Sequence, residues 1–291
     1  GLESYETTGL NSSDTTTPGV LTITGITGLN KEYNGTTSAN TTGSPTLVGV
    51  LGGDIVTFGS DTAPVFTFVT ANVGTGITVN TSGYTISGTD SGNYTLTQPT
   101  LSGDITAAPL TVTASSGQIK VYGATDPTLT YSISGFVNGD TATGLDTGVS
   151  ISRAAGEVVG AYTITPSAAA DSNYSVSFVT ADFSITAASL TITGLTGSNK
   201  VYDGTTNATA SETPVLSGVG SDDEVDSGGT PVFTFASAEL GTDIQITTTG
   251  FIITGADSGN YTLTQPTLSA DILTTLGVDD ITDVKFSLKL Y

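Results

Sequence analysis

An internal repeat is the feature that most constrains the fold of this chain of 291 residues. Strand-like segments of the form Leu-Thr-(Ile/Val)-Thr begin at Leu21, Leu110 and Leu190, and a Lys-x-Tyr motif starts ten residues after each Leu. A repeated segment of this length is normally one structural unit, so we expect three tandem domains. The outer two share the segment SGNYTLTQPTLS and the middle one differs, which gives the order A-B-A.

Two markers occur in every repeat and define its register. The first is the Lys-x-Tyr motif with a nearby glycine, and the second is an Asx-rich turn that ends in Tyr. The signature residues are Lys31, Tyr33, Gly35, Lys120, Tyr122, Gly123, Lys200, Tyr202, Gly204, Tyr94, Tyr174 and Tyr261. They predict an N-terminal extension (1–19), three domains (20–108, 109–188 and 189–273) and a C-terminal segment (274–291). The linkers are short and lack glycine, so we expect a stiff, rod-like arrangement.

Each repeat has the pattern of a small all-β domain. Short alternating runs such as Val65-Phe-Thr-Phe68 are separated by turns rich in Gly, Asn and Asp, and Thr, Val, Ile, Tyr and Phe favour strands. No segment has the periodicity of a helix. The sequence predicts three small β domains and leaves two folds open for each, an immunoglobulin-like sandwich or a β-grasp-like sheet.

Composition excludes several chemistries. The chain contains no Cys and no His, so thiol nucleophiles, His-based triads, the usual zinc and haem sites and disulfides are ruled out. The formal net charge of −21 disfavours nucleic acid and anionic membrane surfaces as partners. No apolar run is long enough to cross a membrane. We therefore expect no enzymatic activity, no cofactor and no membrane insertion.

The markers resemble those of known repeat families. The segments Lys-Val-Tyr-Asp-Gly-Thr-Thr at 200–206 and Lys-Glu-Tyr-Asn-Gly-Thr-Thr at 31–37 resemble the YDG repeat domain of large bacterial surface proteins. The middle repeat, with Lys-Val-Tyr-Gly-Ala-Thr-Asp-Pro at 120–127, resembles the YGX-type MBG repeat, which is interleaved with YDG repeats in adhesin-like proteins. The resemblance implies an adhesin-like protein at the cell surface or outside the cell.

The C-terminal segment carries a second resemblance. Leu-Gly-Val-Asp-Asp at 276–280 and Phe-Ser-Leu-Lys-Leu-Tyr at 286–291 are similar to the start of the C-terminal sorting domain of type IX secretion substrates in Bacteroidota. In that group, Asp-Ser/Thr-aliphatic segments are O-glycosylation signals. The similar segments of this chain make three residues candidates for modification: Thr15, Thr62 and Thr141.

The conserved register of the Lys and Tyr residues has a structural interpretation. We expect each Lys to lie exposed over a turn, with a core Tyr beside it, because Lys is rarely buried without a partner. The alternative is an intramolecular isopeptide bond from a buried Lys. We expect the Tyr of each Asx-rich turn to pack its ring inward and to place its hydroxyl near backbone. The turn residues Asp90, Asp171 and Asp257 are predicted to form Asx-turns.

An acidic loop is the one candidate for a metal site. Asp222, Glu224 and Asp226 alternate as calcium ligands do, but the spacing does not fit an EF-hand. We expect a solvated acidic loop, with calcium binding as the alternative.

The favoured function is a non-catalytic, adhesin-like repeat segment that acts as a stiff stalk or presents weak binding surfaces. One alternative is a self-assembling filament or sheath subunit, in which a terminal segment (1–19 or 274–291) adds a strand to a neighbouring copy. The other is an array of carbohydrate-binding modules that use surface Tyr residues. The corresponding partners are further copies of the chain or cell-surface glycans.

Overall fold

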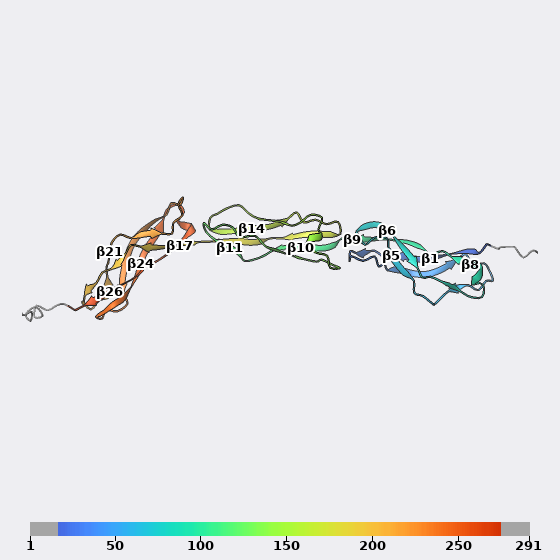
Figure 1. Cartoon of the computed structure of the whole chain (residues 1–291), viewed down its shortest axis with the longest axis horizontal. Coiled ribbons are helices and arrows are strands. Elements are labelled where there is room, and N and C mark those ends of the chain that lie inside the picture. The colour runs from blue at the N-terminus through green and yellow to red at the C-terminus, as the bar shows by residue number, and fades with distance from the viewer. Residues whose placement is uncertain (1–16, 275–291) are drawn as a thin grey trace, which may run out of the picture. The chain divides into compact units, whose positions relative to one another are not determined.

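The computed structural model describes residues 17–274 and is an all-β protein (Figure 1). Within that range the helical segments are three short 3-10 turns: η1 (Ser91–Asn93), η2 (Ala142–Gly144) and η3 (Ser258–Asn260). This confirms the predicted class. A β-grasp-like domain needs a helix against its sheet, so that alternative is not realised in the described residues. No helix there is long and apolar enough to span a membrane.

The first repeat forms two main sheets and a small two-stranded sheet, coloured blue to green in Figure 1. Its strands are β1 (Gly19–Gly28), β2 (Lys31–Glu32), β3 (Thr41–Val48), β4 (Thr57–Phe58), β5 (Val65–Phe68), β6 (Gly74–Ser82), β7 (Ile86–Ser87), β8 (Tyr94–Leu96) and β9 (Thr100–Thr106). The strand orders are β3-β1-β8, β2-β9-β6-β5 and β4-β7. Alternation along β1 buries Leu21 and Ile23, which explains the pattern seen in the sequence.

The middle repeat has one three-stranded and one four-stranded sheet. Its strands are β10 (Ala108–Ala114), β11 (Gln118–Val121), β12 (Tyr131–Ser134), β13 (Ser150–Arg153), β14 (Gly160–Ser167), β15 (Tyr174–Val179) and β16 (Ala181–Thr186). The strand orders are β12-β10-β15 and β11-β16-β14-β13.

The third repeat follows the plan of the first, with longer strands in its larger sheet. Its strands are β17 (Ala188–Thr193), β18 (Thr196–Gly197), β19 (Lys200–Val201), β20 (Asn207–Ala208), β21 (Ala210–Ser211), β22 (Val215–Ser217), β23 (Asp226–Phe235), β24 (Gly241–Thr254), β25 (Tyr261–Thr264) and β26 (Thr267–Leu273). The strand orders are β22-β17-β25, β18-β21 and β19-β26-β24-β23-β20.

Contacts divide the chain into two compact units that do not coincide with the three repeats. Among the described residues, the first unit comprises 17–113, 131–150 and 166–179, and the second comprises 114–130, 151–165 and 180–274. The middle repeat therefore contributes to both. Its β12-β10-β15 sheet lies largely in the first unit, and its β11-β16-β14-β13 sheet largely in the second.

In the first unit a single core runs from the first repeat into the start of the middle one. Phe68, Val79 and Ile105 of the first repeat pack in one cluster with Leu110 and Tyr174 of the middle repeat. A shared apolar core stabilises a junction in proportion to the area removed from water, about 25 cal/mol per Å². The two repeats are thus joined by packing as well as by the chain.

The second unit has two cores. One, in the middle repeat, contains Ala114, Ile164, Phe183 and Ile185. The other, in the third repeat, contains Phe235, Ile246, Ala270 and Ile272. Phe183, Ile164 and Ile246 are fully buried.

Strand register places the two sequence markers where the chain enters and leaves each repeat. The Tyr after the Asx-rich turn pairs in parallel with the start of the first strand: Tyr94 with Gly19, Tyr174 with Ala108 and Tyr261 with Ala188. We call this the entrance of a repeat.

The Lys-x-Tyr motif lies instead beside the last strand, which we call the exit. The backbone N–H of each motif Tyr donates to the carbonyl at the end of that strand: Tyr33 to Thr106, Tyr122 to Thr186 and Tyr202 to Leu273. One residue, Ala107 or Ala187, separates the last strand of one repeat from the first strand of the next. The exit of one repeat must therefore meet the entrance of the next.

Candidate functional site

At Ala107 the exit of the first repeat and the entrance of the middle repeat form a joint built from two tyrosines and one aspartate. The Tyr33 hydroxyl donates to Asp140 Oδ2 at 3.0 Å, and the Tyr174 hydroxyl donates to the same oxygen at 2.7 Å. The two rings meet edge to face, with centroids 5.4 Å apart. Both rings are buried. Residues from two repeats thus share one acceptor inside one compact unit.

Two further hydrogen bonds close this first joint. The Asn173 Oδ1 atom accepts the backbone N–H of Val73 at 3.0 Å, and Asn138 Nδ2 donates to the Gly35 carbonyl at 3.3 Å. Gly35 has φ of 71°, and a Cβ there would lie 2.5 Å from the Asn138 side chain. The glycine of the first Lys-x-Tyr marker is therefore required both by its left-handed backbone and by the close approach of the next repeat.

The joint at Ala187, inside the second unit, repeats the same chemistry. The Tyr122 hydroxyl donates to Asp223 Oδ1 at 2.9 Å, and the Tyr261 hydroxyl donates to Asp223 Oδ2. The two rings again meet edge to face, at 5.3 Å. Asn260 Oδ1 accepts the Val159 N–H at 2.9 Å, as Asn173 does in the first joint.

Both joints raise tyrosine pKa values, because a carboxylate and burial oppose ionisation of the phenol. The hydrogen bond to Asp223, with burial, raises the pKa of Tyr122 to about 12. Burial, with the bond to Asp140, raises the pKa of Tyr174 to about 12. All these hydroxyls are therefore protonated at neutral pH and act as donors.

The acceptor aspartates occupy the same position of a turn in each repeat, and the sequence analysis did not identify this position. In each repeat the entrance Tyr hydroxyl accepts a backbone N–H, from Leu51, Val137 or Gly220. The Asp three residues later, Asp54, Asp140 or Asp223, accepts from that hydroxyl. The separation from Asp to Tyr is 40, 34 or 38 residues, and this variation concealed the pair.

The turn residues that the sequence assigned to Asx-turns differ among themselves. Asp171 Oδ1 accepts the N–H of Asn173 two residues on, as an Asx-turn requires. Asp90 and Asp257 instead accept N–H groups of a distant loop, from Ile55 and Glu224. The prediction of Asx-turns was wrong for these two aspartates, because their carboxylates accept hydrogen bonds from the loop that carries the acceptor aspartate and not from their own turn.

We predicted that the signature lysines lie exposed over their turns, and the structure shows that they do not. Lys31 is half-buried: its Nζ donates to Asn34 Oδ1 at 2.9 Å and to two carbonyl groups of the same loop. It also lies 5.5 Å from the centroid of Phe68. The Lys200 Nζ atom similarly contacts Asp203 Oδ1 at 2.8 Å and lies over the ring of Phe235. Each Lys thus closes the loop that follows its motif, because the loop carbonyls turn inward toward the ammonium group.

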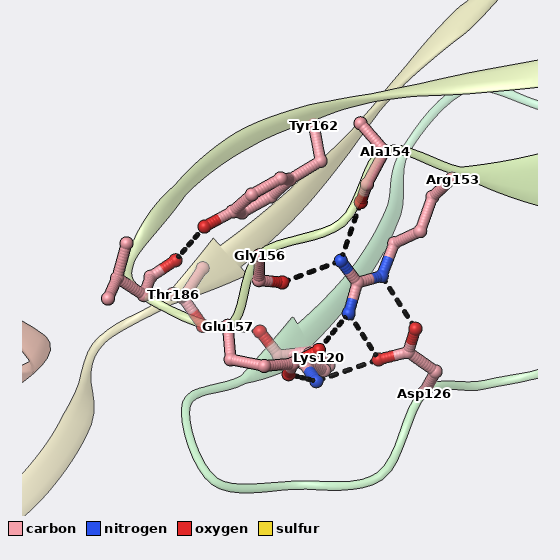
Figure 2. Close-up of polar contacts among 9 residues, drawn as sticks. Lys120, Asp126, Arg153, Ala154, Gly156, Glu157, Tyr162 and Thr186 are labelled. Atoms are coloured by element: carbon pink, nitrogen blue, oxygen red, sulfur yellow. Dashed lines mark hydrogen bonds and ion pairs between the residues drawn. The ribbon is translucent and has the colours of Figure 1, made fainter.

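Lys120 of the middle repeat is buried, at 7% exposed, and belongs to an ion-pair network (Figure 2). Its Nζ contacts Asp126 Oδ1 at 2.7 Å and Glu157. Arg153 bridges the same two carboxylates and donates to the carbonyls of Ala154 and Gly156 (Figure 2). The expectation of exposure was wrong here because two carboxylates supply the partners that burial demands.

This network does not favour the isopeptide alternative. An amine attacks a neutral carboxyl group, whereas the Arg153 guanidinium and Lys120 lower the pKa of Asp126 to about 2. The same two cations lower the pKa of Glu157. Both carboxylates are ionised at neutral pH and act as ion-pair partners.

The motif tyrosines of the first and third repeats differ in exposure. Tyr33 is 8% exposed and packs in the first joint, as a core Tyr would. Tyr202, at the exit of the third repeat, is 46% exposed. The Tyr94 ring, at the entrance of the first repeat, is buried, and its hydroxyl donates to Asp54 at 2.6 Å.

The described residues gather no group of three or more His, Cys, Asp or Glu side chains that could hold a metal ion. Asp222, Glu224 and Asp226 are not brought together. Their neighbour Asp223 belongs to the second joint, and the Glu224 N–H donates to Asp257.

Two of the three candidate modification sites lie in the described part of the chain. Thr62 and Thr141 are exposed, and their hydroxyl groups contact the Gly83 carbonyl and the Thr143 hydroxyl. Thr15 and the segment that resembles a sorting domain lie outside the described residues. So do most of the terminal segments considered for strand exchange.

Comparisons with known proteins give a consistent family assignment. The family model described as "YDG domain" matches residues 17–101 and 186–268, and the one described as "MBG domain (YGX type)" matches residues 110–184. No curated protein matches the chain.

One solved structure with similarity contains three N-terminal domains of the bacteriophage RB49 highly immunogenic outer capsid protein (Hoc). It is 12% identical, the match covers 88% of this chain and 100% of that chain, and the TM-score is 0.31. At that TM-score the similarity carries no argument about this chain.

Proposed function

Since the chain belongs to the YDG domain family, with a YGX-type MBG domain between its two YDG domains, we propose that it is a non-catalytic, adhesin-like repeat segment displayed outside the cell. Its role is to hold consecutive repeats in a fixed relation, as a spacer for whatever the surface protein presents.

The observation that carries this proposal is the recurrence of one joint. Two different pairs of repeats, YDG with MBG and MBG with YDG, are joined by the same tyrosine pair, the same shared aspartate and the same Asn-to-backbone bond. In both junctions the polar side chains bond to one another across the two repeats. A device that fixes one repeat against the next must lie at such a junction.

The joint restrains motion in several independent ways. A linker of one residue leaves few backbone torsions free, and the edge-to-face ring pair resists sliding. The two tyrosine donors on one carboxylate, together with the Asn acceptor, fix the rotation of one repeat against the next. Since Tyr33, Tyr174 and Tyr261 are buried and Tyr122 is half-buried, each of these hydrogen bonds is worth more than one exposed to water.

A distance measurement across the first joint tests the proposal. The chain has no Cys, so Thr46→Cys and Ser132→Cys introduce two unique spin-label sites on exposed positions of β3 and β12. We expect a narrow distance distribution in the otherwise unchanged chain. Asp140→Ala should broaden it, because both tyrosine hydroxyls lose their shared acceptor.

Two controls make the result specific. Asp61→Ala removes an exposed carboxylate from the first repeat and should leave the distribution unchanged. A label pair within the first repeat, Thr46→Cys with Thr100→Cys, should stay narrow even when Asp140 is replaced. A broad distribution across the joint in the unsubstituted chain would refute the spacer role.

A further inference from the structure

The entrance of the first repeat has the same machinery as the two joints. The Tyr94 hydroxyl accepts the Leu51 N–H at 3.1 Å and donates to Asp54 Oδ2, as Tyr174 and Tyr261 do with their own turns. Gly19 pairs in parallel with Tyr94, just as Ala108 pairs with Tyr174. We call Asp54, Asn93 and Tyr94 the open entrance.

Within residues 17–274, the open entrance lacks the donors that its two counterparts have. In each joint the turn aspartate accepts from a second tyrosine that belongs to the preceding repeat. No described residue other than Tyr94 donates to the Asp54 carboxylate. The side chain of Asn93, which corresponds to Asn173 and Asn260, has no hydrogen-bond partner in the described part of the chain.

The corresponding asparagines are more buried in the two joints than at the open entrance. Asn260 is 6% exposed in the second joint, Asn173 is half-buried in the first, and Asn93 is exposed. A surface pocket opens beside these groups, lined in part by Leu51, Asp54, Asn93 and Tyr94. The open entrance therefore presents a carboxylate and an amide oxygen next to a recess.

The complementary half of the joint lies at the exit of the third repeat. The Tyr202 N–H donates to the Leu273 carbonyl at 2.9 Å, which is the bond that positions Tyr33 and Tyr122. Gly204 has φ of 73°, close to the 71° of Gly35. The Tyr202 ring, however, is exposed, and so are its apolar neighbours Val201 and Leu273. We call Val201, Tyr202 and Leu273 the open exit.

We propose that the open exit of one copy of this chain docks on the open entrance of a second copy, with the Tyr202 hydroxyl donating to Asp54 and a backbone N–H of the exit side donating to Asn93. Each copy carries one half of each kind, so the contact is head to tail and heterologous. It reproduces, between copies, the bonds that the chain makes twice within itself. It goes beyond the spacer role, since a spacer needs only the joints within one chain.

The contact between copies is weaker than the internal joints. A linker of one residue holds exit and entrance together within a chain, whereas two copies must also offset the loss of their translational and rotational freedom. The net charge of −21 on each copy adds repulsion that salt screens. We therefore expect association to increase between low and moderate NaCl concentration, which is the reverse of an ion-pair interface.

A disulfide-trapping experiment measures the docking directly. In the first joint Gly35 and Asn138 approach closely, and the positions that correspond to them are Gly204 at the open exit and Gly52 at the open entrance. Chains with Gly52→Cys and chains with Gly204→Cys are mixed in equal amounts under mild oxidation. Random collision gives twice as much mixed dimer as either uniform dimer, and we expect an excess of about five-fold or more over that ratio.

Matched variants identify the groups responsible. Tyr202→Phe in the Gly204→Cys chain keeps the ring but removes the hydroxyl, and Asn93→Ala in the Gly52→Cys chain alters an exposed side chain. Each should return the mixed dimer toward the random ratio. Tyr131→Phe, at an exposed tyrosine of β12, should not.

A second measurement avoids the strain of Cys at the left-handed position 204. The unsubstituted chain, labelled with ¹⁵N, is titrated with the unlabelled chain at moderate NaCl, and amide shifts are followed. Shifts at Leu51, Asn93 and Tyr202 that Tyr202→Phe abolishes support the proposal. A random dimer ratio, or amide shifts that are the same with Tyr202→Phe as without it, would overturn the docking proposal. Neither result would affect the joints within the chain.

Discussion

Replacing Asp140 with Ala removes the one acceptor that two buried tyrosines of the first joint share. The Tyr33 hydroxyl, 3.0 Å from Asp140, has no other described hydrogen-bond partner. Tyr174 loses its acceptor as well but keeps the N–H of Val137, at 3.1 Å. The two hydroxyls are therefore affected unequally.

The expected loss follows from these contacts. A buried hydroxyl left unsatisfied costs about 1 to 3 kcal/mol, and losing one of two partners costs about 1 kcal/mol. We expect Asp140→Ala to lower the unfolding free energy of the first unit by about 2 to 4 kcal/mol. Tyr33→Phe alone removes one bond and should cost about 1 kcal/mol.

The double variant supplies the sharper test. In Tyr33→Phe/Asp140→Ala the hydroxyl that Asp140→Ala would strand is absent, so its cost disappears. The two single effects should therefore exceed the double effect by about 1 kcal/mol or more.

Urea unfolding of the full chain, combined with differential scanning calorimetry, measures these quantities. The two units need not unfold together, so each transition is analysed separately. Asp223→Ala is the internal comparison, since it removes the shared acceptor of the second joint and should affect the second unit instead. Additive single effects, or equal losses from Asp140→Ala and the exposed Asp61→Ala, would refute the joint as a stabilising contact.

Three further results are expected from the same contacts. Absorbance titration near 295 nm should show a Tyr122 pKa near 12 that falls in Asp223→Asn, and an unchanged Tyr122 pKa in the variant would contradict the assignment. Because the folded-state pKa lies above the usual value of 10, the stability linked to this group is complete below pH 10 and declines as the pH rises toward 12. In acid the sign reverses: the pKa of Asp126 is lowered to about 2, so the stability of the second unit should hold above pH 4 and decline toward pH 2. Calorimetry across that range should show a smaller decline in Asp126→Asn, with the remainder due to the lowered pKa values of Glu157 and Asp203. Phe183→Ala should destabilise the second unit by about 3 to 5 kcal/mol in urea unfolding, because the Phe183 ring is fully buried and lies beneath the Arg153 guanidinium. A loss below about 1 kcal/mol would mean that the core collapses around the gap.

The repeat, the class of fold and the family were determined by the sequence alone. Markers such as the Lys-x-Tyr motif recur at fixed spacing from a strand start, and alternation along strands such as β1 is a local property that survives without knowledge of the partners. Side-chain chemistry absent from the chain, such as that of Cys and His, is equally plain from composition.

Only the tertiary structure decided what the markers do. Tyr33 and Asp140 are 107 residues apart, and Tyr122 and Asp223 are 101 apart, in different repeats. Their meeting depends on parallel register at an exit and at the following entrance, which no local pattern records.

The lysines show the same limit. Whether Lys120 is buried depends on two carboxylates and an arginine that other segments bring to it, while Lys31 and Lys200 only close their own loops. The shared Lys-x-Tyr motif therefore has different environments in different repeats. A sequence motif specifies the backbone that forms around it, whereas the burial and partners of a side chain are set by whatever the fold packs against it.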